Sequence, residues 1–195
     1  LSNVLISELC GYLNEENVVA VQSKVRMYNY NENFLTKMQD ADFTIFGNVV
    51  LKAKDMLNKS AMLGGNGQIT KREVISNIGG WDGFAITEDL NLSIKLMLDG
   101  YDIRYCGDVS VWQEAVSEWK PFFRQRKSWI MGNMETLFVY FDKILFSDMP
   151  LIRKADALQY LFLLLFILFV MLAYIVFVLN FFIIYPIQIN ISFTI

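Results

Sequence analysis

The sequence predicts an α/β domain followed by a long apolar helix, and three observations support this fold class. Segments with the apolar spacing of helices alternate with short β-branched runs. Asp156 is the last charged residue, and the uncharged stretch 157–185 is long enough to cross a bilayer once. Apolar types make up 54% of the 195 residues, which is high for a soluble domain. The excess of apolar residues lies mainly in that C-terminal stretch.

Residues 1–118 carry the alternation, and we expect them to form one domain. The helices predicted there are 1–13, 34–57, 71–79 and a fourth that begins after Thr87 and ends at Gly100. The predicted strands are 17–28, which is rich in β-branched residues, and two short pieces within 101–115. A glycine-rich turn lies between the second and third helices, within 61–70.

Residues 119–156 mix aromatic and basic side chains, so we expect amphipathic helices at a membrane surface. A solvated basic helix is the alternative, but the density of aromatic residues argues against it. Residues 157–185 are expected to form a transmembrane helix, with a buried core helix as the alternative. Residues 186–195 follow the helix-stopping Pro186 and alternate like a strand, so we expect the tail of a truncated chain.

Charges and cysteines suggest where the domain lies. Arg153 and Lys154 precede the apolar stretch, and the positive-inside rule then places residues 1–156 on the cytoplasmic face of the cell membrane. Cys10 and Cys106 lie in that preceding portion, where a reducing compartment would keep them as thiols. The net charge of −3 argues against a nucleic-acid partner.

The sequence contains no histidine, which excludes Ser-His and Cys-His nucleophile pairs and most zinc sites. Acid–base chemistry in such a protein depends on carboxylates. Thr87, Glu88 and Asp89 stand at the head of the fourth predicted helix. They are interpreted either as a helix cap, with the acidic pair at the positive end of the helix dipole, or as a catalytic group.

Three motifs follow one another along the chain. They are the glycine-rich segment with a Lys/Arg helix at 64–81, Thr-Glu-Asp at 87–89 and Gln-Arg-Lys-Ser-Trp at 125–129. In this order, and before a transmembrane stretch, they resemble the membrane-embedded processive glycosyltransferases of family 2. That class includes the synthases of cellulose, chitin, hyaluronan and poly-N-acetylglucosamine. Residues 21–29, which read VQSKVRMYN, are also similar to a segment of that family.

The resemblance implies a fold and a set of roles. It implies the C-terminal, acceptor-binding part of a GT-A-type glycosyltransferase domain, followed by an amphipathic interface helix and a transmembrane helix. Asp89 would be the catalytic base, with Glu88 and Thr87 orienting it. The implied donor-binding residues are Gln125, Arg126 and Lys127. The implied acceptor-binding residues are Trp129, Gly64, Gly65 and Asn66.

Two of these assignments have purely structural alternatives. Trp129 is also suited to anchor a helix at a membrane interface. The glycines and Asn66 also suit an ordinary turn. The indole face of Trp129 would stack on the acceptor sugar, and the glycines would let backbone approach that sugar closely.

Two departures from the family pattern stand out. Ser128 occupies the position of the family's arginine before the tryptophan, so Arg126 or Lys127 would have to replace that cation. The family also binds Mg²⁺ or Mn²⁺ through Asp-x-Asp at a strand end. Asp40-Ala41-Asp42 has these letters but lies in a predicted helix, so we interpret it as a solvated acidic helix face. The metal ligands are therefore expected upstream of Leu1.

The sequence thus predicts an inverting glycosyltransferase. It would move a sugar from a nucleotide-diphosphate donor to a growing polysaccharide or lipid acceptor, beside membrane lipid. One alternative is a non-processive glycolipid glycosyltransferase. The other is a catalytically inactive, membrane-anchored remnant that lacks the nucleotide and metal site.

Overall fold

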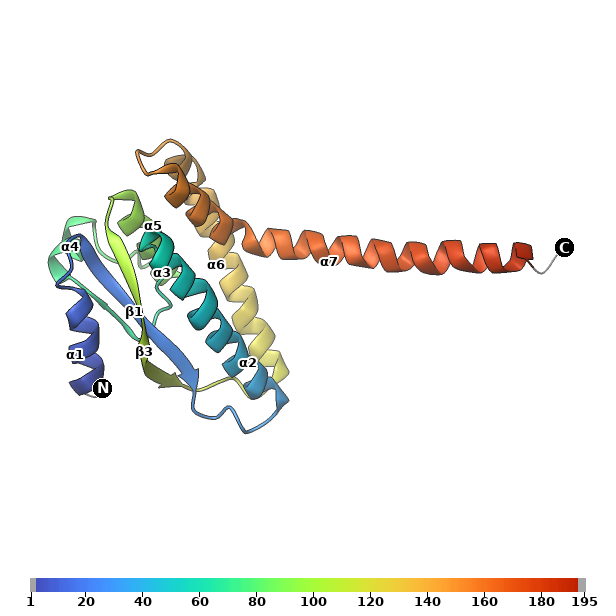
Figure 1. The fold of residues 1–195 in the computed structure, drawn as a ribbon, viewed down its shortest axis with the longest axis horizontal. Helices are drawn as coiled ribbons and strands as arrows, with labels where there is room; N and C mark the ends of the chain where they lie inside the picture. Colours follow the sequence, from blue (N-terminus) through green and yellow to red (C-terminus); the bar gives the residue numbers. More distant parts are fainter. Residues whose placement is uncertain (1–2, 193–195) are drawn as a thin grey trace. The chain divides into compact units, whose positions relative to one another are not determined.

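The computed structural model describes the backbone of residues 3–192 and the side chains of residues 3–163 and 165–181. The chain divides into two compact units, the first ending at Leu158 and the second beginning at Gln159. The first unit mixes helices with a sheet, which confirms the predicted α/β class (Figure 1).

The sheet of the first unit has three strands in the order β2-β1-β3. Its central strand β1 (Val18–Met27) pairs antiparallel with β2 (Gln68–Thr70) and parallel with β3 (Asp102–Gln113). The β-branched start of β1 is fully buried, as expected for a strand with neighbours on both edges and helices on both faces. Strand β2 had been predicted only as part of the glycine-rich turn.

The prediction of two short strands within 101–115 is wrong, because β3 is one strand of 12 residues. The pairing with β1 jumps from Ser23–Cys106 to Lys24–Ser110, so Gly107 to Val109 bulge out of the ladder. The bulge explains why the sequence pattern breaks there. The continuous partner β1 keeps both parts of β3 in one strand.

Helix α1 (Asn3–Tyr12) covers one face of the sheet, as its leucine spacing predicts. Leu5 and Leu9 pack with Val18, Val21 and Cys106 in a buried cluster. Side chains alternate along a strand, so the neighbouring Gln22 points to the opposite face. That opposite face is the one that carries the candidate site.

The predicted helix 34–57 is a nearly continuous helical rod with a wide turn in its middle. It consists of α2 (Phe34–Ile45), the π-helical turn η1 (Phe46–Leu51) and α3 (Lys52–Asn58). An Asn33–Thr36 capping box starts it, and Lys59 ends it in the left-handed conformation at φ 49°. Gly47 lies in the wide turn against Tyr105 of β3.

Two shorter helices were predicted correctly. Helix α4 (Arg72–Asn77) ends before Gly79, whose φ is 84°. Helix α5 (Glu88–Leu98) ends before Gly100, whose φ is 82°. The apolar side of α5 is buried and packs against β3 and α6.

The region 119–156, predicted as amphipathic helices, contains α6 (Trp119–Leu145) and the start of α7 (Leu151–Ser192). One side of α6 is buried, and this side includes Phe122, Gly132 and Tyr140. Its opposite side exposes large apolar side chains such as Phe123 and Phe138. The amphipathic pattern is thus present, and its role at a membrane surface stays a prediction.

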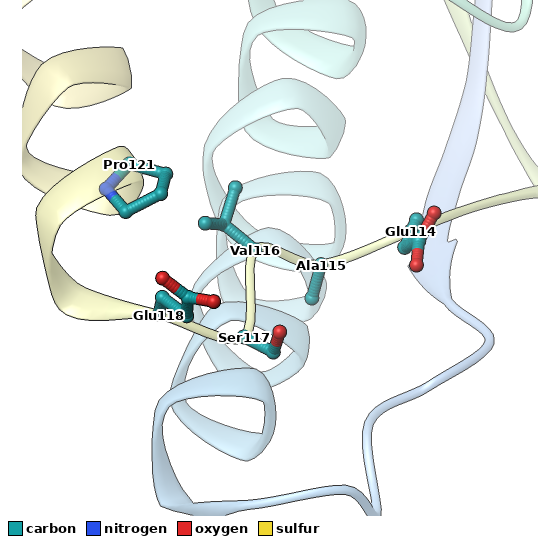
Figure 2. A pocket seen from close by; sticks show the side chains of 6 residues that line it. All are labelled: Glu114, Ala115, Val116, Ser117, Glu118 and Pro121. Carbon is teal, nitrogen blue, oxygen red and sulfur yellow. The ribbon is translucent and has the colours of Figure 1, made fainter.

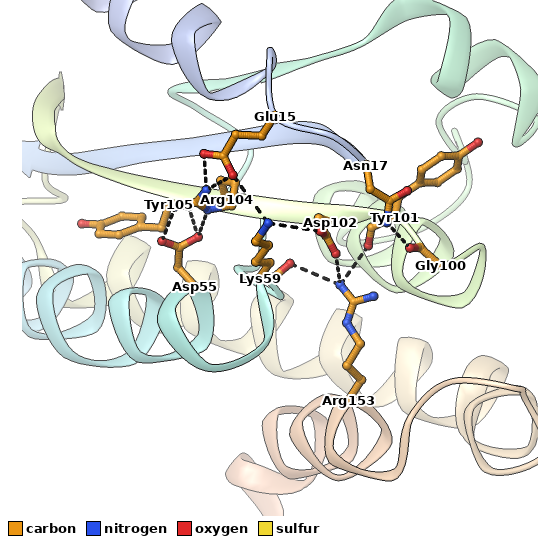
Figure 3. A network of polar contacts seen from close by, with 10 residues as sticks. All are labelled: Glu15, Asn17, Asp55, Lys59, Gly100, Tyr101, Asp102, Arg104, Tyr105 and Arg153. Atoms are coloured by element: carbon orange, nitrogen blue, oxygen red, sulfur yellow. Dashed lines mark hydrogen bonds and ion pairs between the residues drawn. The ribbon is translucent and has the colours of Figure 1, made fainter.

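The first turns of α7 belong to the first unit and are held there by ion pairs (Figure 3). The Arg153 guanidinium lies 2.7 Å from Asp102 and also donates to the Tyr101 carbonyl at 3.1 Å. The Lys54 ammonium lies 2.6 Å from Asp156. Arg153, one of the two cations used in the positive-inside argument, is therefore paired with groups of the first unit.

The predicted transmembrane helix 157–185 falls within α7. Within the described residues, no single straight helix is long and apolar enough to cross a membrane. A bent pair, Leu151–Leu163 and Leu165–Phe181 with 50° between them, has the length and composition for it.

The strand expected in the tail is not formed where the structure describes the chain. Helix α7 continues past Pro186 to Ser192, and residues 193–195 lie outside the described part. An isolated strand has no partner for its backbone groups, whereas a helix satisfies them internally.

Candidate functional site

Thr87, Glu88 and Asp89 form the start of α5, as predicted. Thr87 occupies the N-cap position, but its hydroxyl makes no capping hydrogen bond to the described backbone. Its Oγ1 is buried without a partner in the described part of the chain. The helix-cap interpretation therefore holds for the position of Thr87 but not for its hydroxyl. Its side chain instead packs against α6, as described below.

The Asp89 carboxyl is partly buried, whereas Glu88 is exposed. Burial raises the pKa of Asp89, and the neighbouring Glu88 carboxylate raises it further. Asp89 Oδ1 accepts a hydrogen bond from the backbone N–H of Leu90 at 2.7 Å, and this bond opposes the rise in pKa. A carboxylate with a raised pKa is a better proton acceptor near neutral pH, because base strength follows pKa.

The glycine-rich loop lies directly beside this carboxyl group. Gly65 has φ 78°, a conformation that glycine adopts without strain. A Cβ atom at Gly65 would lie 3.2 Å from Asp89 Oδ2. The predicted acceptor loop and the predicted base, separated by more than twenty positions in the sequence, are thus neighbours in the fold.

Side chains from three elements hold the loop. Gln22 of β1 accepts from Gly64 N–H at 2.8 Å and donates to the Asn66 carbonyl at 2.8 Å. Gln113 of β3 bonds the side chain of Asn66. Ser93 of α5 accepts from the backbone N–H of Leu63 at 2.9 Å.

Sequence reasoning did not single out Gln22, Ser93 or Gln113. A polar residue within the β-branched run of β1 was a signal for Gln22, since a buried amide needs partners. Ser93 and Gln113 gave no comparable signal in the sequence.

Helix α6 packs against the start of α5. A Cβ atom at Gly132 would lie 2.5 Å from Thr87 Oγ1, so the absence of a side chain at this glycine allows the approach. Glu135 accepts from the backbone N–H of Ile86 at 3.0 Å, and Tyr140 donates to Asn91 at 3.0 Å. Trp129 lies three positions before Gly132, about 4.5 Å along the helix axis. The third predicted motif is thus attached to the same helix start as the second.

Arg126 has the most side-chain contacts of the residues in the third motif. Its guanidinium lies 3.0 Å from Asp42 of α2 and 4.5 Å from the centre of the Trp129 ring. The ring of Trp129 also meets the edge of Phe43 at 6.1 Å. One face of the indole is therefore covered by Arg126, and a sugar would have to stack on the other face.

Other residues of this motif are less constrained. Gln125 is partly buried, whereas Lys127 and Ser128 are exposed. The Ser128 hydroxyl donates to the carbonyl of Arg124 at 3.2 Å, a bond within its own helix. The donor and acceptor roles of Gln125, Arg126, Lys127 and Trp129 stay predictions.

Asp40 and Asp42 lie on α2, which agrees with the predicted helix. The interpretation as a solvated face is wrong for Asp40, which is buried. Arg26 donates to its two carboxylate oxygens at 2.9 and 2.8 Å, and Met27 N–H donates at 2.9 Å. Hydrogen bonding to Arg26 lowers the pKa of Asp40. The sequence pattern showed the helix but could not show the arginine from β1.

The described residues contain no group of three or more His, Cys, Asp or Glu side chains placed to hold a metal ion. The acidic side chains described in the candidate site are Asp89, Glu88, which faces solvent, and Glu135, which accepts from the Ile86 N–H. The residues present therefore do not form a site for Mg²⁺ or Mn²⁺, which takes several converging oxygen ligands.

A pocket of about 340 Å³ lies between the end of β3 and the start of α6. Figure 2 shows its lining, which includes Glu114, Ser117, Glu118 and Pro121. The lining contains none of the predicted site residues. The candidate site is therefore the surface formed by Asp89, the glycine-rich loop and α6.

Comparison with known proteins agrees with this arrangement. Residues 5–193 match the family model described as glycosyl transferase family group 2. The chain therefore belongs to this family. The class of chemistry that the family name states is glycosyl transfer.

Three relatives illustrate the range of the family. A probable glycosyltransferase YdaM of Bacillus subtilis (strain 168) is 31% identical over 123 residues, which are 63% of this chain and 29% of the relative. The beta-monoglucosyldiacylglycerol synthase of Trichormus variabilis is 33% identical over 146 residues, 75% of this chain and 31% of the relative. The probable glucomannan 4-beta-mannosyltransferase 7 of Oryza sativa subsp. japonica is 26% identical over 163 residues, 83% of this chain and 28% of the relative. The chain thus spans less than a third of each relative.

Proposed function

We propose that the protein is an inverting glycosyltransferase in which Asp89 is the catalytic base. The observation that carries this proposal is the partly buried Asp89 carboxyl, at the start of α5 and against the backbone of Gly65. The raised pKa of this carboxyl suits a group that must take up a proton during the reaction.

The proposed step balances as a single displacement. The hydroxyl oxygen of the acceptor attacks the anomeric carbon of the donor sugar, and its proton passes to Asp89. The bond between the anomeric carbon and the diphosphate oxygen breaks, and the nucleoside diphosphate leaves with the bonding electrons. Attack from the face opposite the leaving group inverts the anomeric configuration.

Other residues would bind the two substrates. Arg126, which is held by Asp42 and lies over the Trp129 ring, would bind the donor diphosphate with Gln125 and Lys127. The face of the Trp129 indole that Arg126 does not cover, together with the Gly64–Asn66 loop, would hold the acceptor. Mg²⁺ or Mn²⁺, which the family resemblance implies, would offset the charge of the diphosphate when bound.

The acceptor is a lipid or a growing polysaccharide. A relative named for a glucosyldiacylglycerol product and a relative named for glucomannan are both similar to this chain. The exposed apolar side of α6 and the apolar bent pair in α7 support a location at the cytoplasmic face of a membrane. The length of the product separates a glycolipid transferase from a processive synthase.

Transfer by an Asp89→Asn variant tests the proposal. We expect the intact protein with this change to lose transfer from UDP-glucose, UDP-N-acetylglucosamine and GDP-mannose by about 10²–10⁴-fold, the usual contribution of a positioned base. Asp99→Asn is the matched control, since Asp99 is an exposed carboxylate at the far end of the same helix.

Two outcomes would count against the proposal. Normal turnover by Asp89→Asn would remove this carboxyl from the mechanism. An intact protein that folds but transfers none of the three sugars, with or without added Mn²⁺, would favour the inactive remnant instead.

A further inference from the structure

The backbone around Asp89 is joined to the glycine-rich loop by a single buried hydroxyl. Ser93 Oγ donates to the Asp89 carbonyl at 2.8 Å and accepts from the Leu63 N–H at 2.9 Å. The Ser93 side chain is fully buried. It therefore bridges the turn that carries the base and the residue that precedes Gly64.

A second buried side chain holds the same loop from the opposite side. Gln22 is 1% exposed, and its amide bonds Gly64 N–H and the Asn66 carbonyl. These two bonds fix both ends of the Gly64–Asn66 turn, and Gly65 between them lies against Asp89 Oδ2. The position of the loop over the carboxyl is thus set by hydrogen bonds from β1 and from α5.

We propose that Ser93 and Gln22 are positioning residues that hold the Gly64–Asn66 loop closed against the Asp89 carboxyl during sugar transfer. This inference rests on the proposed function, because it assigns the two side chains a part in the same step. Neither residue would touch the substrate. Both would act through the loop and through Asp89.

We call the Ser93 and Gln22 side chains the clamps of the loop. Loss of either clamp is expected to change the pKa of Asp89. A loop that lifts from Asp89 admits water to the carboxyl, and hydration reduces the desolvation that raises its pKa. The acidic limb of the rate profile then moves to lower pH. The turnover number falls because the acceptor is less well placed, since small displacements in an active site are costly.

Burial has a larger effect on the pKa of Asp89 than the charged groups around it. On α5 itself the neighbour is Glu88, and α6 contributes Glu135. On β3, which packs against α5, Arg104 pairs with Asp55 and Asp102 pairs with Arg153. The loop 63–67 carries no charged side chain.

The test compares Ser93→Ala and Gln22→Met with Ser76→Ala in the intact protein. Ser76 is a matched control, because its exposed hydroxyl donates to the Arg72 carbonyl within α4. Two quantities are measured: amide hydrogen exchange across residues 61–67, and the pH dependence of turnover with the donor sugar accepted by the unmodified protein.

For Ser93→Ala, which removes one buried hydrogen bond to the loop, we expect exchange in 61–67 to accelerate about tenfold. For Gln22→Met, which removes two such bonds, we expect at least the same acceleration. We also expect a turnover number about tenfold lower and an acidic limb at lower pH, with the KM for the donor unchanged. Ser76→Ala should change none of these. The two site variants lie on different elements, so the test can still be made if one of them fails to fold.

The outcomes separate this inference from the proposed function. Faster exchange with unchanged turnover and pH profile would make the clamps purely structural and overturn the inference. Unchanged exchange would show that the clamps do not hold the loop and would also overturn it. Normal turnover by Asp89→Asn would instead overturn the proposed function, whatever the exchange shows.

Discussion

The partly buried Asp89 carboxyl, for which we propose a catalytic role, carries a cost to stability. Its pKa is raised in the folded protein by burial, so the ionised form is less favourable there than in the unfolded chain. The carboxyl contributes most to stability at low pH, below the ordinary value of about 3.9. That contribution is lost as the pH rises through the raised value.

We therefore predict that Asp89→Asn stabilises the protein above the raised pKa but not below about pH 3.9. The amide is uncharged at every pH, so it avoids the cost of burying a carboxylate. Thermal unfolding of the intact protein at about pH 3 and at about pH 8, on the two sides of this range, would measure the difference. A melting temperature for Asp89→Asn below that of the unmodified protein at pH 8 would contradict the prediction, with Asp99→Asn as the control.

At the scale of elements, the wide turn η1 packs closely against β3 where Gly47 meets Tyr105. A Cβ atom at Gly47 would lie 2.5 Å from the Tyr105 hydroxyl and 3.4 Å from the ring carbon that carries it. That hydroxyl is buried without a hydrogen-bond partner in the described part of the chain, and burial raises the pKa of Tyr105 to about 12. The hydroxyl alone therefore excludes a side chain from Gly47.

We predict that the effect of replacing Gly47 depends on whether residue 105 carries a hydroxyl. In the unmodified protein, Gly47→Ala should destabilise the fold by about 1–3 kcal/mol through overpacking. In a Tyr105→Phe background the same change meets only ordinary contact, and alanine then stabilises the helix by up to about 1 kcal/mol. Denaturant unfolding of the four proteins would measure both changes.

Gly11→Ala is the matched control, because Gly11 also lies in a helix and a Cβ there meets nothing within 4 Å. Equal effects of Gly47→Ala in the two backgrounds would show that the Tyr105 hydroxyl is not the obstacle.

Across the whole molecule, buried charges hold the first turns of α7 within the first unit. Burial lowers the pKa of Lys54, and the Asp156 carboxylate opposes this by accepting from its ammonium group. Asp156 also accepts from the Ser60 hydroxyl at 2.5 Å. This contact secures the residues that lead into the apolar helix.

We predict that Asp156→Asn destabilises the first unit by about 3–5 kcal/mol, because the buried ammonium loses its carboxylate. The loss should shrink as the pH rises and Lys54 gives up its proton. The double variant Lys54→Met/Asp156→Leu, which removes both charges, should cost less than Asp156→Asn alone. Unfolding at two pH values would test this, and a larger cost for the double variant would contradict it.

Much of the fold was predictable because its signals are local. Apolar spacing indicated α1, the rod from α2 to α3, and α5, and the β-branched run indicated β1. Strand β2 and the continuity of β3 were missed, since a three-residue strand and a bulged strand depend on a partner elsewhere in the chain. Thr87 was predicted as the N-cap of α5 and occupies that position, but its hydroxyl packs near Gly132 and makes no capping hydrogen bond.

The sequence by itself determined the α/β class, the order of the three motifs and the family that they indicate, because these depend on spacing and residue type. Only the tertiary structure decided that the Gly64–Asn66 loop meets Asp89, that Asp40 binds Arg26, and that Ser93 and Gln22 hold the loop. These contacts join residues from different elements. Their partners are selected by sheet pairing and helix packing, which act over distances that no local pattern records.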